Sequence, residues 1–183
     1  MQVCIYLHKK NKKMLTKSII EFITISKEFC AYLEISEHES QRVFVEKTQK
    51  LLSLLYLKAL LLESNNEVEG YCEQYVTEEQ WEFVHQNIET TLGELDVYIE
   101  VVSPEYSNDE KDTMPISEAL TDIYQDIREF TDRMRTDNDE IREVAVYECM
   151  LQFSLYWGPR ALSVMQEFHT LMFSPNSKLD SNE

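Results

Sequence analysis

Glycine and proline are scarce in this chain, which has only three Gly and four Pro among 183 residues. A β fold with many turns needs more of both residues, so long regular elements are favoured. Cysteine is also scarce, and Cys4, Cys30, Cys72 and Cys149 form no C-x-x-C pair. This spacing argues against a zinc knuckle or a disulfide framework and favours a reducing compartment.

Long apolar runs are missing as well. The most apolar segment, residues 51–62, includes Ser53 and Lys58 and is too short to span a membrane. The first apolar run, residues 3–7, is too short for the core of a secretory signal, and its lysines follow it instead of preceding it. We therefore expect a cytoplasmic protein that makes no membrane contact.

Basic residues are few: 17 Lys and Arg stand against 34 Asp and Glu, and the net charge is −17. Five of the lysines lie in the first 20 residues, which contain no acid, so the other 163 residues carry a net charge of −22. Such a surface repels phosphate backbones, and we expect no direct nucleic-acid binding. It is compatible with simple solvation and also with a basic protein partner.

Motifs of known catalytic sites are absent from the sequence. There is no G-x-S-x-G elbow, no glycine-rich phosphate loop and no H-E-x-x-H motif. Glu82-x-x-His85 has the spacing used in di-iron bundles, but those sites need two copies and this chain has one. We therefore predict no catalytic residue, no metal and no cofactor.

The clearest positive signal is segment 116–134, where apolar residues recur at alternating steps of four and three. These residues are Ile116, Leu120, Ile123, Ile127, Phe130 and Met134. Their spacing places all of them on one side of a helix. The opposite side carries Glu118, Asp122, Asp126 and Glu129. The pattern predicts a helix that is buried on one face and acidic on the other.

Capping signals divide the rest of the chain into helices. The pattern S/T-x-x-E/Q predicts helix starts at Ser18, Ser36 and Thr77. These helices are predicted to end near Leu33, Leu62 and Val102, and Gly93 is expected to permit a bend or close packing in the third. After segment 116–134, Asp137 or Asn138 is predicted to cap a fifth helix. Gly158-Pro159 is predicted to end it and to start a sixth, which runs to about Phe173.

These elements predict an all-α fold, a helical bundle of about six helices and no convincing strand. Residues 17–173 would form a single domain between a basic, disordered extension (1–16) and a disordered tail (174–183). The second, fourth and fifth helices are expected at the core, because the second is apolar around most of its circumference. Polar residues 103–115 are expected to form a loop.

Three motifs in the chain resemble an uncharacterised bacterial family, the domain-of-unknown-function family numbered 5063. The motifs are YVTEE at 75–79 before a Trp-bearing helix, ISEALTDIYQDI at 116–127 and YWG at 156–158. The resemblance extends from about Lys17 to Phe173. It implies an α-helical, cytoplasmic bacterial protein without an established activity. It also implies gene neighbours that encode an exonuclease and an RNA methyltransferase, either of which would be a candidate partner.

The best candidate site on the predicted acidic face is the pair Asp122 and Asp126, with Tyr124 and Gln125 between them. Two carboxylates one helical turn apart repel each other, by about 0.2–0.5 kcal/mol in an isolated helix. They could bind basic side chains of neighbouring helices, contact a partner, or hold a cation or a shifted proton. Ion pairing within the fold is the simplest of these interpretations.

A second candidate lies at the predicted corner between the fifth and sixth helices. Trp157 could be an exposed anchor for another protein, although a tryptophan at such a corner more often closes the core. Arg160 is a candidate partner for an acid on another helix, either Asp122 or Asp126.

The function predicted from these patterns is a non-enzymatic, cytoplasmic protein–protein interaction module. It would bind a basic protein through an acidic face around Asp122, Asp126 and the loop 103–115. One alternative is a bundle that binds a small molecule or a metal between its helices, either as a binding protein or as an enzyme. Another is an acidic mimic of nucleic acid that regulates a nuclease or an RNA methyltransferase.

Overall fold

The computed structural model describes residues 15–35, 40–63, 74–102, 112–175 and 179. Within these ranges the chain is mainly helical, as predicted, with one short hairpin. The α-helices are α1 (Lys17–Leu33), α2 (Gln41–Leu60), α3 (Glu78–Leu92), α4 (Ile116–Arg133), α5 (Asp139–Gln152) and α6 (Gly158–Phe173). A 3₁₀ turn (Gly93–Leu95) and the strands β1 (Tyr98–Val101) and β2 (Asp112–Pro115) connect α3 to α4.

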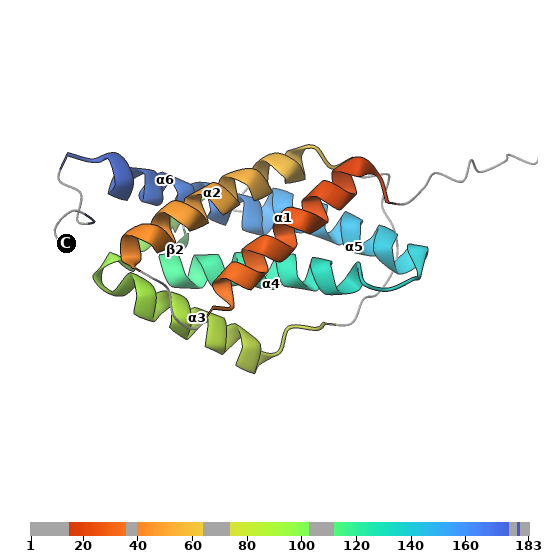
Figure 1. The fold of residues 1–183 in the computed structure, drawn as a ribbon, viewed down its shortest axis with the longest axis horizontal. Coiled ribbons are helices and arrows are strands. Elements are labelled where there is room, and N and C mark those ends of the chain that lie inside the picture. The colour runs from red at the N-terminus through yellow and green to blue at the C-terminus, as the bar shows by residue number, and fades with distance from the viewer. Residues whose placement is uncertain (1–14, 36–39, 64–73, 103–111, 176–178, 180–183) are drawn as a thin grey trace, which may run out of the picture.

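Helix α4 lies at the centre of the bundle. It contacts α1, α3, α5 and α6, and Figure 1 shows it running between α3 on one side and α1 and α2 on the other. Its apolar stripe faces inward: Ile116, Leu120, Ile123 and Ile127 are fully buried. The helix predicted from the alternating spacing is therefore confirmed in its limits and in its buried apolar face. The predicted acidic face is less open than expected, because Glu129 is buried as well.

Aromatic side chains fill the core beside α4. Phe22 of α1 lies with its ring centroid 5.0 Å from that of Phe130 and 6.4 Å from that of Trp157. Phe153 contacts Trp157 from the preceding turn, with their ring centroids 4.6 Å apart. Residues distant in the sequence thus meet in one apolar cluster that joins α1, α4 and the turn directly before α6.

Helix starts follow the predicted chemistry at some positions and shift by a few residues at others. Thr77 and Gln80 form the predicted capping box of α3, and Asn138 caps α5. Helix α1, however, is capped by Thr16, whose hydroxyl accepts a hydrogen bond from the Ile19 amide. The predicted cap Ser18 therefore lies inside the helix, because Thr16 offers the same hydroxyl two residues earlier.

A similar shift occurs at the start of α2. Ser40 is the cap, and its hydroxyl accepts a hydrogen bond from the Val43 amide. The predicted capping box at Ser36 and Glu39 lies outside the described residues.

The third helix ends ten residues earlier than its apolar spacing predicts. Gly93 adopts a φ of 50°, a left-handed conformation that glycine tolerates and that breaks the helical repeat. From Tyr98 to Val101 the chain alternates exposed and buried residues, as a strand does. The predicted helical residue Val102 is accordingly exposed, while its neighbour Val101 is buried. Spacing alone cannot distinguish the two structures over so short a segment.

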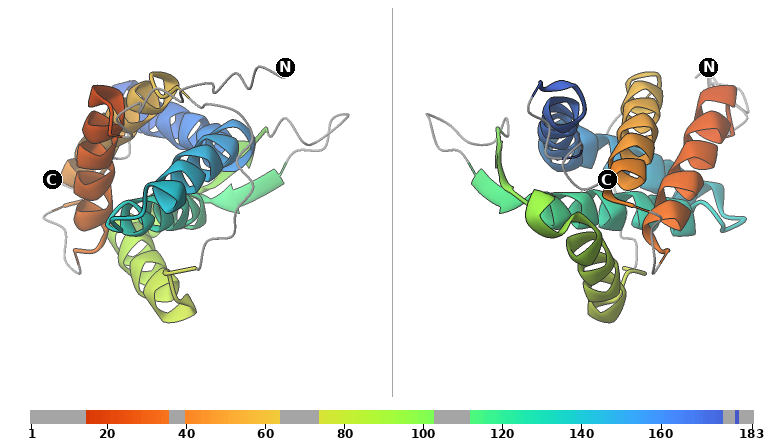
Figure 2. Two further views of the ribbon diagram at one scale, coloured as in Figure 1. Left: turned by 90° about the vertical axis from the view of Figure 1, so that its right-hand side faces the viewer. Right: turned by 60° about the vertical axis from the view of Figure 1, so that its left-hand side comes forward.

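The predicted loop 103–115 ends in a strand. Residues 103–111 lie outside the described part, and β2 pairs antiparallel with β1, with Ile99 opposite Met114 and Tyr98 opposite Pro115. The hairpin lies at one side of the bundle, beyond the end of α3 (Figure 2). It brings the chain back to the start of α4.

Helix α2 lies at the surface of the bundle, contrary to the prediction that it is enclosed. It packs mainly on α1 and α6, and three of its leucines, together with Leu61 directly after it, are about half exposed: Leu54, Leu57, Leu60 and Leu61. The prediction counted apolar residues around the helix, but only one of its sides has neighbours in the described structure. The central position predicted for α2 is thus wrong, whereas that for α4 is confirmed.

The junction between α5 and α6 is a π-helical turn, Phe153–Trp157, and not the predicted break. Trp157 and Gly158 both keep right-handed helical angles. A Cβ atom on Gly158 would overlap the carbonyl oxygen of Phe153. Glycine is therefore required here for close packing and not to end a helix.

The two predicted flanking segments are described only in small part. Residues 1–14 and most of 176–183 lie outside the described ranges. Leu179, within the predicted disordered tail, is buried in the hydrophobic core. Among the described helices, none is long and apolar enough to cross a membrane.

Candidate functional site

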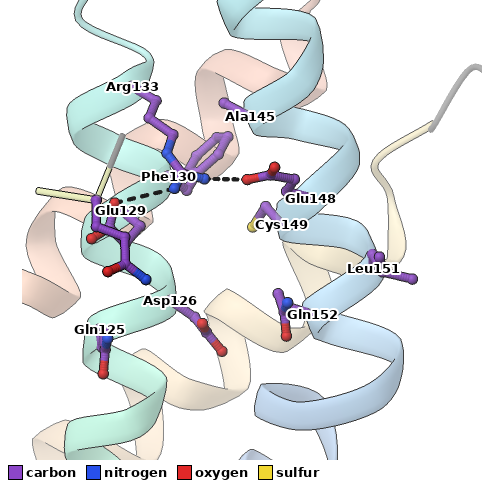
Figure 3. Close-up of a pocket in the computed structure, with 11 residues that line it drawn as sticks. Gln125, Asp126, Glu129, Phe130, Arg133, Ala145, Glu148, Cys149, Leu151 and Gln152 are labelled. Atoms are coloured by element: carbon purple, nitrogen blue, oxygen red, sulfur yellow. Dashed lines mark hydrogen bonds and ion pairs between the residues drawn. The ribbon is translucent and has the colours of Figure 1, made fainter. Parts of the chain in front are cut away.

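A pocket of about 540 Å³ opens between α4 and α5. Figure 3 shows side chains of both helices around it, with Asp126 of α4 and Gln152 of α5 directed into the same space. The lining residues are Gln74, Gln125, Asp126, Glu129, Phe130, Arg133, Ala145, Glu148, Cys149, Leu151 and Gln152. Its volume is typical of small-molecule sites in proteins.

Asp126 is the unusual group in this pocket. No hydrogen bond or ion pair reaches its carboxylate from the described residues. Burial raises the pKa of this carboxyl to about 7, and the nearby charges of Asp122 and Glu129 add to the rise. Arg160 and Arg133 act in the opposite direction without cancelling it. An acid that titrates near neutrality in a concave site is a recognised indicator of function.

Arg133 occupies the other end of the pocket and is already bound by two acids. Its guanidinium forms ion pairs with Glu148 of α5 and with Glu129 one turn earlier on α4, the latter at 3.4 Å. Figure 3 shows the two interactions as dashed lines. With Asp126 ionised, three carboxylates and one guanidinium line the pocket, so its net charge is −2.

Glu129 also ties the segment before α3 to α4. Its Oε1 accepts hydrogen bonds from the backbone amides of Tyr75 and Val76, each at 2.8 Å. The side chain is buried, so these amides replace the water that the carboxylate has lost. This role is structural, and it fixes Glu129 at the rim of the pocket.

Asp122 lies one turn before Asp126 in a different environment. Its Oδ2 is 3.2 Å from Nε of Arg160 on α6, and its Oδ1 accepts a hydrogen bond from the indole of Trp81 on α3 at 3.3 Å. Burial raises the pKa of this carboxyl, while Arg160 and Trp81 act to lower it. Asp122 therefore joins three helices, as the ion-pair interpretation expects, and it leaves little free charge for a partner.

Two other predicted site residues belong to the core. The Tyr124 ring is buried and its hydroxyl donates to Oε1 of Glu34 at 2.9 Å. Trp157 is fully buried and its indole donates to the carbonyl of Cys149 at 3.2 Å. An exposed Trp157 anchor is thus excluded in favour of the core interpretation. Of the six predicted residues, Gln125 and Asp126 line the pocket, and Asp122 and Arg160 form a pair beside it.

Asp96, His85 and Ser117 meet at the start of α4. The Ser117 hydroxyl donates to Oδ2 of Asp96 at 2.7 Å and lies 3.3 Å from Nε2 of His85. Because its single proton goes to Asp96, the hydroxyl accepts from His85. A catalytic triad places histidine between serine and aspartate, so this order is wrong for a nucleophile. Asp96 instead caps α4, since its Oδ1 also accepts from the Ser117 amide at 2.8 Å.

The described residues contain no set of side chains that could bind a metal ion. No three His, Cys, Asp or Glu side chains there are placed to hold one ion. Glu82 accepts a hydrogen bond from Gln86, and His85 stacks on Trp81. Cys30 and Cys149 are free and buried, and burial raises the pKa of both thiols.

The pocket residues that sequence reasoning missed are mainly those of α5. Glu148, Cys149 and Gln152 are at helical spacing, but nothing in the sequence shows which neighbour they face. Arg133 could have been linked to Glu129, because the two are four residues apart on one helix.

Residues 13–174 match the family model of a domain of unknown function, DUF5063. The chain belongs to this family. A solved structure is also similar to this chain: the crystal structure of protein BF1032 from Bacteroides fragilis, a target of the Northeast Structural Genomics Consortium. It is 35% identical, with a TM-score of 0.75 over 89% of this chain and 97% of that one. No curated protein matches the chain.

Proposed function

We propose that this DUF5063 protein is a binding protein for a small organic molecule, which it holds in the pocket between α4 and α5. The observation that carries the proposal is the Asp126 carboxylate, directed into a concave space without a protein partner among the described residues. Asp126 is partly buried, and leaving a partly buried carboxylate unpaired costs stability. A bound molecule that completes its interactions would offset that cost.

The environments of the acidic residues on α4 favour small-molecule binding in the pocket over protein binding at an acidic surface of this helix. Asp122 is engaged by Arg160 and Trp81, and Asp126 is directed into the pocket between two helices. A protein partner approaching α4 would therefore meet few free carboxylates. The interaction face predicted around these two aspartates and residues 103–115 stays a prediction, and residues 103–111 of it lie outside the described residues.

The experiment is a fragment screen by NMR, in which binding is detected through side-chain amides that line the pocket. A library with equal numbers of cations, neutral molecules and anions is added to ¹⁵N-labelled protein, and the side-chain amide resonances of Gln125 and Gln152 are followed. Both side chains line the pocket. The exposed amide of Gln86 on α3, bound to Glu82, is the internal control that should not shift.

The matched variant is Gln152→Trp, which fills the pocket opposite Asp126. Binding seen in the wild type should be lost in this variant, with its circular dichroism unchanged. If Gln152→Trp fails to fold, Gln125→Trp takes its place. The proposal is wrong if no fragment shifts the pocket amides, or if fragments bind the filled variant equally well.

A second candidate function is the predicted interaction with a basic protein. The binding surface would then be the outer face of α3 and not the acidic side of α4. Four exposed glutamates occur on this helix: Glu78, Glu79, Glu82 and Glu89. Phe83 is 48% exposed among them, and an exposed aromatic ring within a charged rim is typical of protein interfaces. Such an interaction would take place in the cytoplasm, where the buried Cys30 and Cys149 would stay reduced.

This candidate is tested with two variants of α3, one that removes the Phe83 ring and one that reverses the charge of two glutamates. A Phe83→Ala variant and a Glu79→Lys/Glu82→Lys variant should each lose a basic partner that the wild type retains from a cell extract. Glu143→Lys, an exposed acid on α5, is the matched control. Competition by added nucleic acid would show that the partner binds through a nucleic-acid-binding surface, such as that of a nuclease or an RNA methyltransferase. Retention of the partner by all variants would reject the face.

A further inference from the structure

We infer that the molecule held between α4 and α5 is an organic cation, a protonated amine or a guanidinium, with its charged group against Asp126. The inference rests on the proposed function, since it names the chemical class of ligand for the same pocket. It follows from the charges around the pocket, from the position of Asp126 and from the remaining lining groups.

The charges of the lining residues disfavour an anion. Arg133 is the one basic side chain among the described lining residues, and Glu129 and Glu148 both bind it. An anionic ligand would have to displace one of these acids and would meet the charge of Asp126 as well. Like charges in a partly buried site repel strongly, because the surrounding dielectric is lower than that of water.

The position of Asp126 favours a positive charge over a neutral group. The nearest basic group on α6, Arg160, is held by Asp122, so it does not neutralise Asp126. A neutral ligand that entered the pocket would remove more water from this carboxylate without compensating its charge. An ammonium or guanidinium would instead form a charge-assisted hydrogen bond, which is about twice as strong as a neutral one.

The other lining groups fit the body of such a molecule. Gln125 and Gln152 offer amide donors and acceptors close to Asp126, while Phe130, Cys149 and Leu151 offer apolar surface. The volume of about 540 Å³ is far larger than a metal ion requires. A short apolar body with an amino group at one end, and a polar group near the Arg133 end, would use every part of the pocket.

Binding of this cation should depend on pH. The charged groups around Asp126 are Asp122, Glu129 and Arg133 on α4, Glu148 on α5 and Arg160 on α6, and the Cys149 thiol on α5 is neutral. Burial and the two neighbouring acids of α4 hold the pKa of Asp126 near 7. The carboxylate is therefore charged at pH 8 and mostly protonated at pH 5.5, where the cation should bind more weakly.

The test compares three probes that share a 2-phenylethyl group: 2-phenylethylamine, 2-phenylethanol and 3-phenylpropanoate. Each is titrated into the full chain at pH 8, with the Gln125 and Gln152 amides as the readout. The amine should bind with a Kd at least about tenfold below that of the alcohol, as one charge-assisted hydrogen bond implies. Asp126→Asn should abolish this preference, and Glu143→Gln, which removes an exposed acid of α5, should keep it.

The outcomes separate the ligand class from the pocket itself. If the alcohol or the acid binds as tightly as the amine, or if Asp126→Asn keeps the preference, the cation inference is wrong and the proposed pocket stands. If none of the three probes binds, the fragment library decides. Pocket binders that are not mainly cations reject the ligand class, and the absence of any pocket binder rejects the proposed function together with it.

Discussion

Asp122 of α4 and Arg160 of α6 form an ion pair, with Oδ2 of the aspartate 3.2 Å from Nε of the arginine. Their side chains are 31% and 16% exposed, so the pair is partly withdrawn from water. The same aspartate accepts the indole hydrogen bond of Trp81. One carboxylate thus connects α3, α4 and α6. Because Arg160 is paired with Asp122, its positive charge does not cancel the effect of burial on the pKa of Asp126.

Removal of Arg160 should destabilise the fold. In Arg160→Ala, the half-buried Asp122 loses its counter-charge, and we expect the free energy of unfolding to fall by about 1–3 kcal/mol. Urea denaturation measures this change. Arg135→Ala is the control, since Arg135 is 73% exposed in its pair with Asp132 and should change stability by less than about 0.5 kcal/mol. Equal losses in the two variants would contradict the role of the Asp122 pair.

Asp126→Asn should stabilise the protein at high pH. The pKa of Asp126 is about 7 in the folded state, against about 3.9 in the unfolded chain. Because the folded state holds the proton more tightly, its stability falls as the pH rises from about 4 to 7, and the loss is complete above pH 7. Asparagine has no such loss.

The stability advantage of Asp126→Asn over the wild type should therefore grow by about 2 kcal/mol between pH 5 and pH 8. Urea denaturation of both proteins at the two pH values measures it. The comparison cancels the titration of the other acids, which both proteins share. An advantage that is the same at both pH values would show that Asp126 is an ordinary ionised carboxylate.

Glu129→Ala should detach the segment before α3. The amides of Tyr75 and Val76 would lose their acceptor, and we expect a loss of about 2–4 kcal/mol in the free energy of unfolding. Hydrogen exchange at these two amides should accelerate. Glu129→Gln keeps one oxygen acceptor and should retain part of their protection. Unchanged exchange in the alanine variant would refute this role.

The α5–α6 junction should not tolerate a side chain at Gly158. A Cβ atom there would overlap the Phe153 carbonyl, and we expect Gly158→Ala to cost about 2–3 kcal/mol through overpacking. Thermal denaturation followed by circular dichroism measures the loss. Leu162→Ala, at a position 50% exposed on α6, serves as the reference. A Gly158→Ala variant as stable as this reference would mean that the junction relaxes freely.

The cap of α1 distinguishes the structure from the sequence pattern. Thr16→Ala removes the hydroxyl that accepts from the Ile19 amide and should cost about 1 kcal/mol. Ser18→Ala, at the cap predicted from S-x-x-E, should change stability by less than about 0.5 kcal/mol. Chemical denaturation of the two variants decides between the positions, and the reverse order would restore the predicted capping box.

Several elements could be predicted from sequence because their causes are local. The alternating steps from Ile116 to Met134 identify α4 and its buried side, and Thr77 with Gln80 identifies the start of α3. The helix start at Thr16 was missed by two residues, because two hydroxyl side chains compete for the same role. The end of α3 was missed because Leu95 and Ile99 fit a helical period as well as a strand.

The candidate site could be predicted only in part. Asp126 and Gln125 were identified from their place on the polar side of α4, and Arg160 as a partner for Asp122 or Asp126. Glu148 and Gln152 were not identified, since their role depends on the side that α5 turns toward α4. The sequence also could not show that Asp122 is paired while Asp126, one turn later, is not.

The sequence by itself determined the mainly helical class, the position of α4 along the chain and the acidic balance, because periodicity, capping and charge act within a few residues. Tertiary structure alone decided that α2 lies at the surface, that β1 and β2 pair, and that a pocket opens beside Asp126. These outcomes depend on which helices pack against each other. Burial, pairing and the pKa of Asp126 are properties of that packing and not of any single segment.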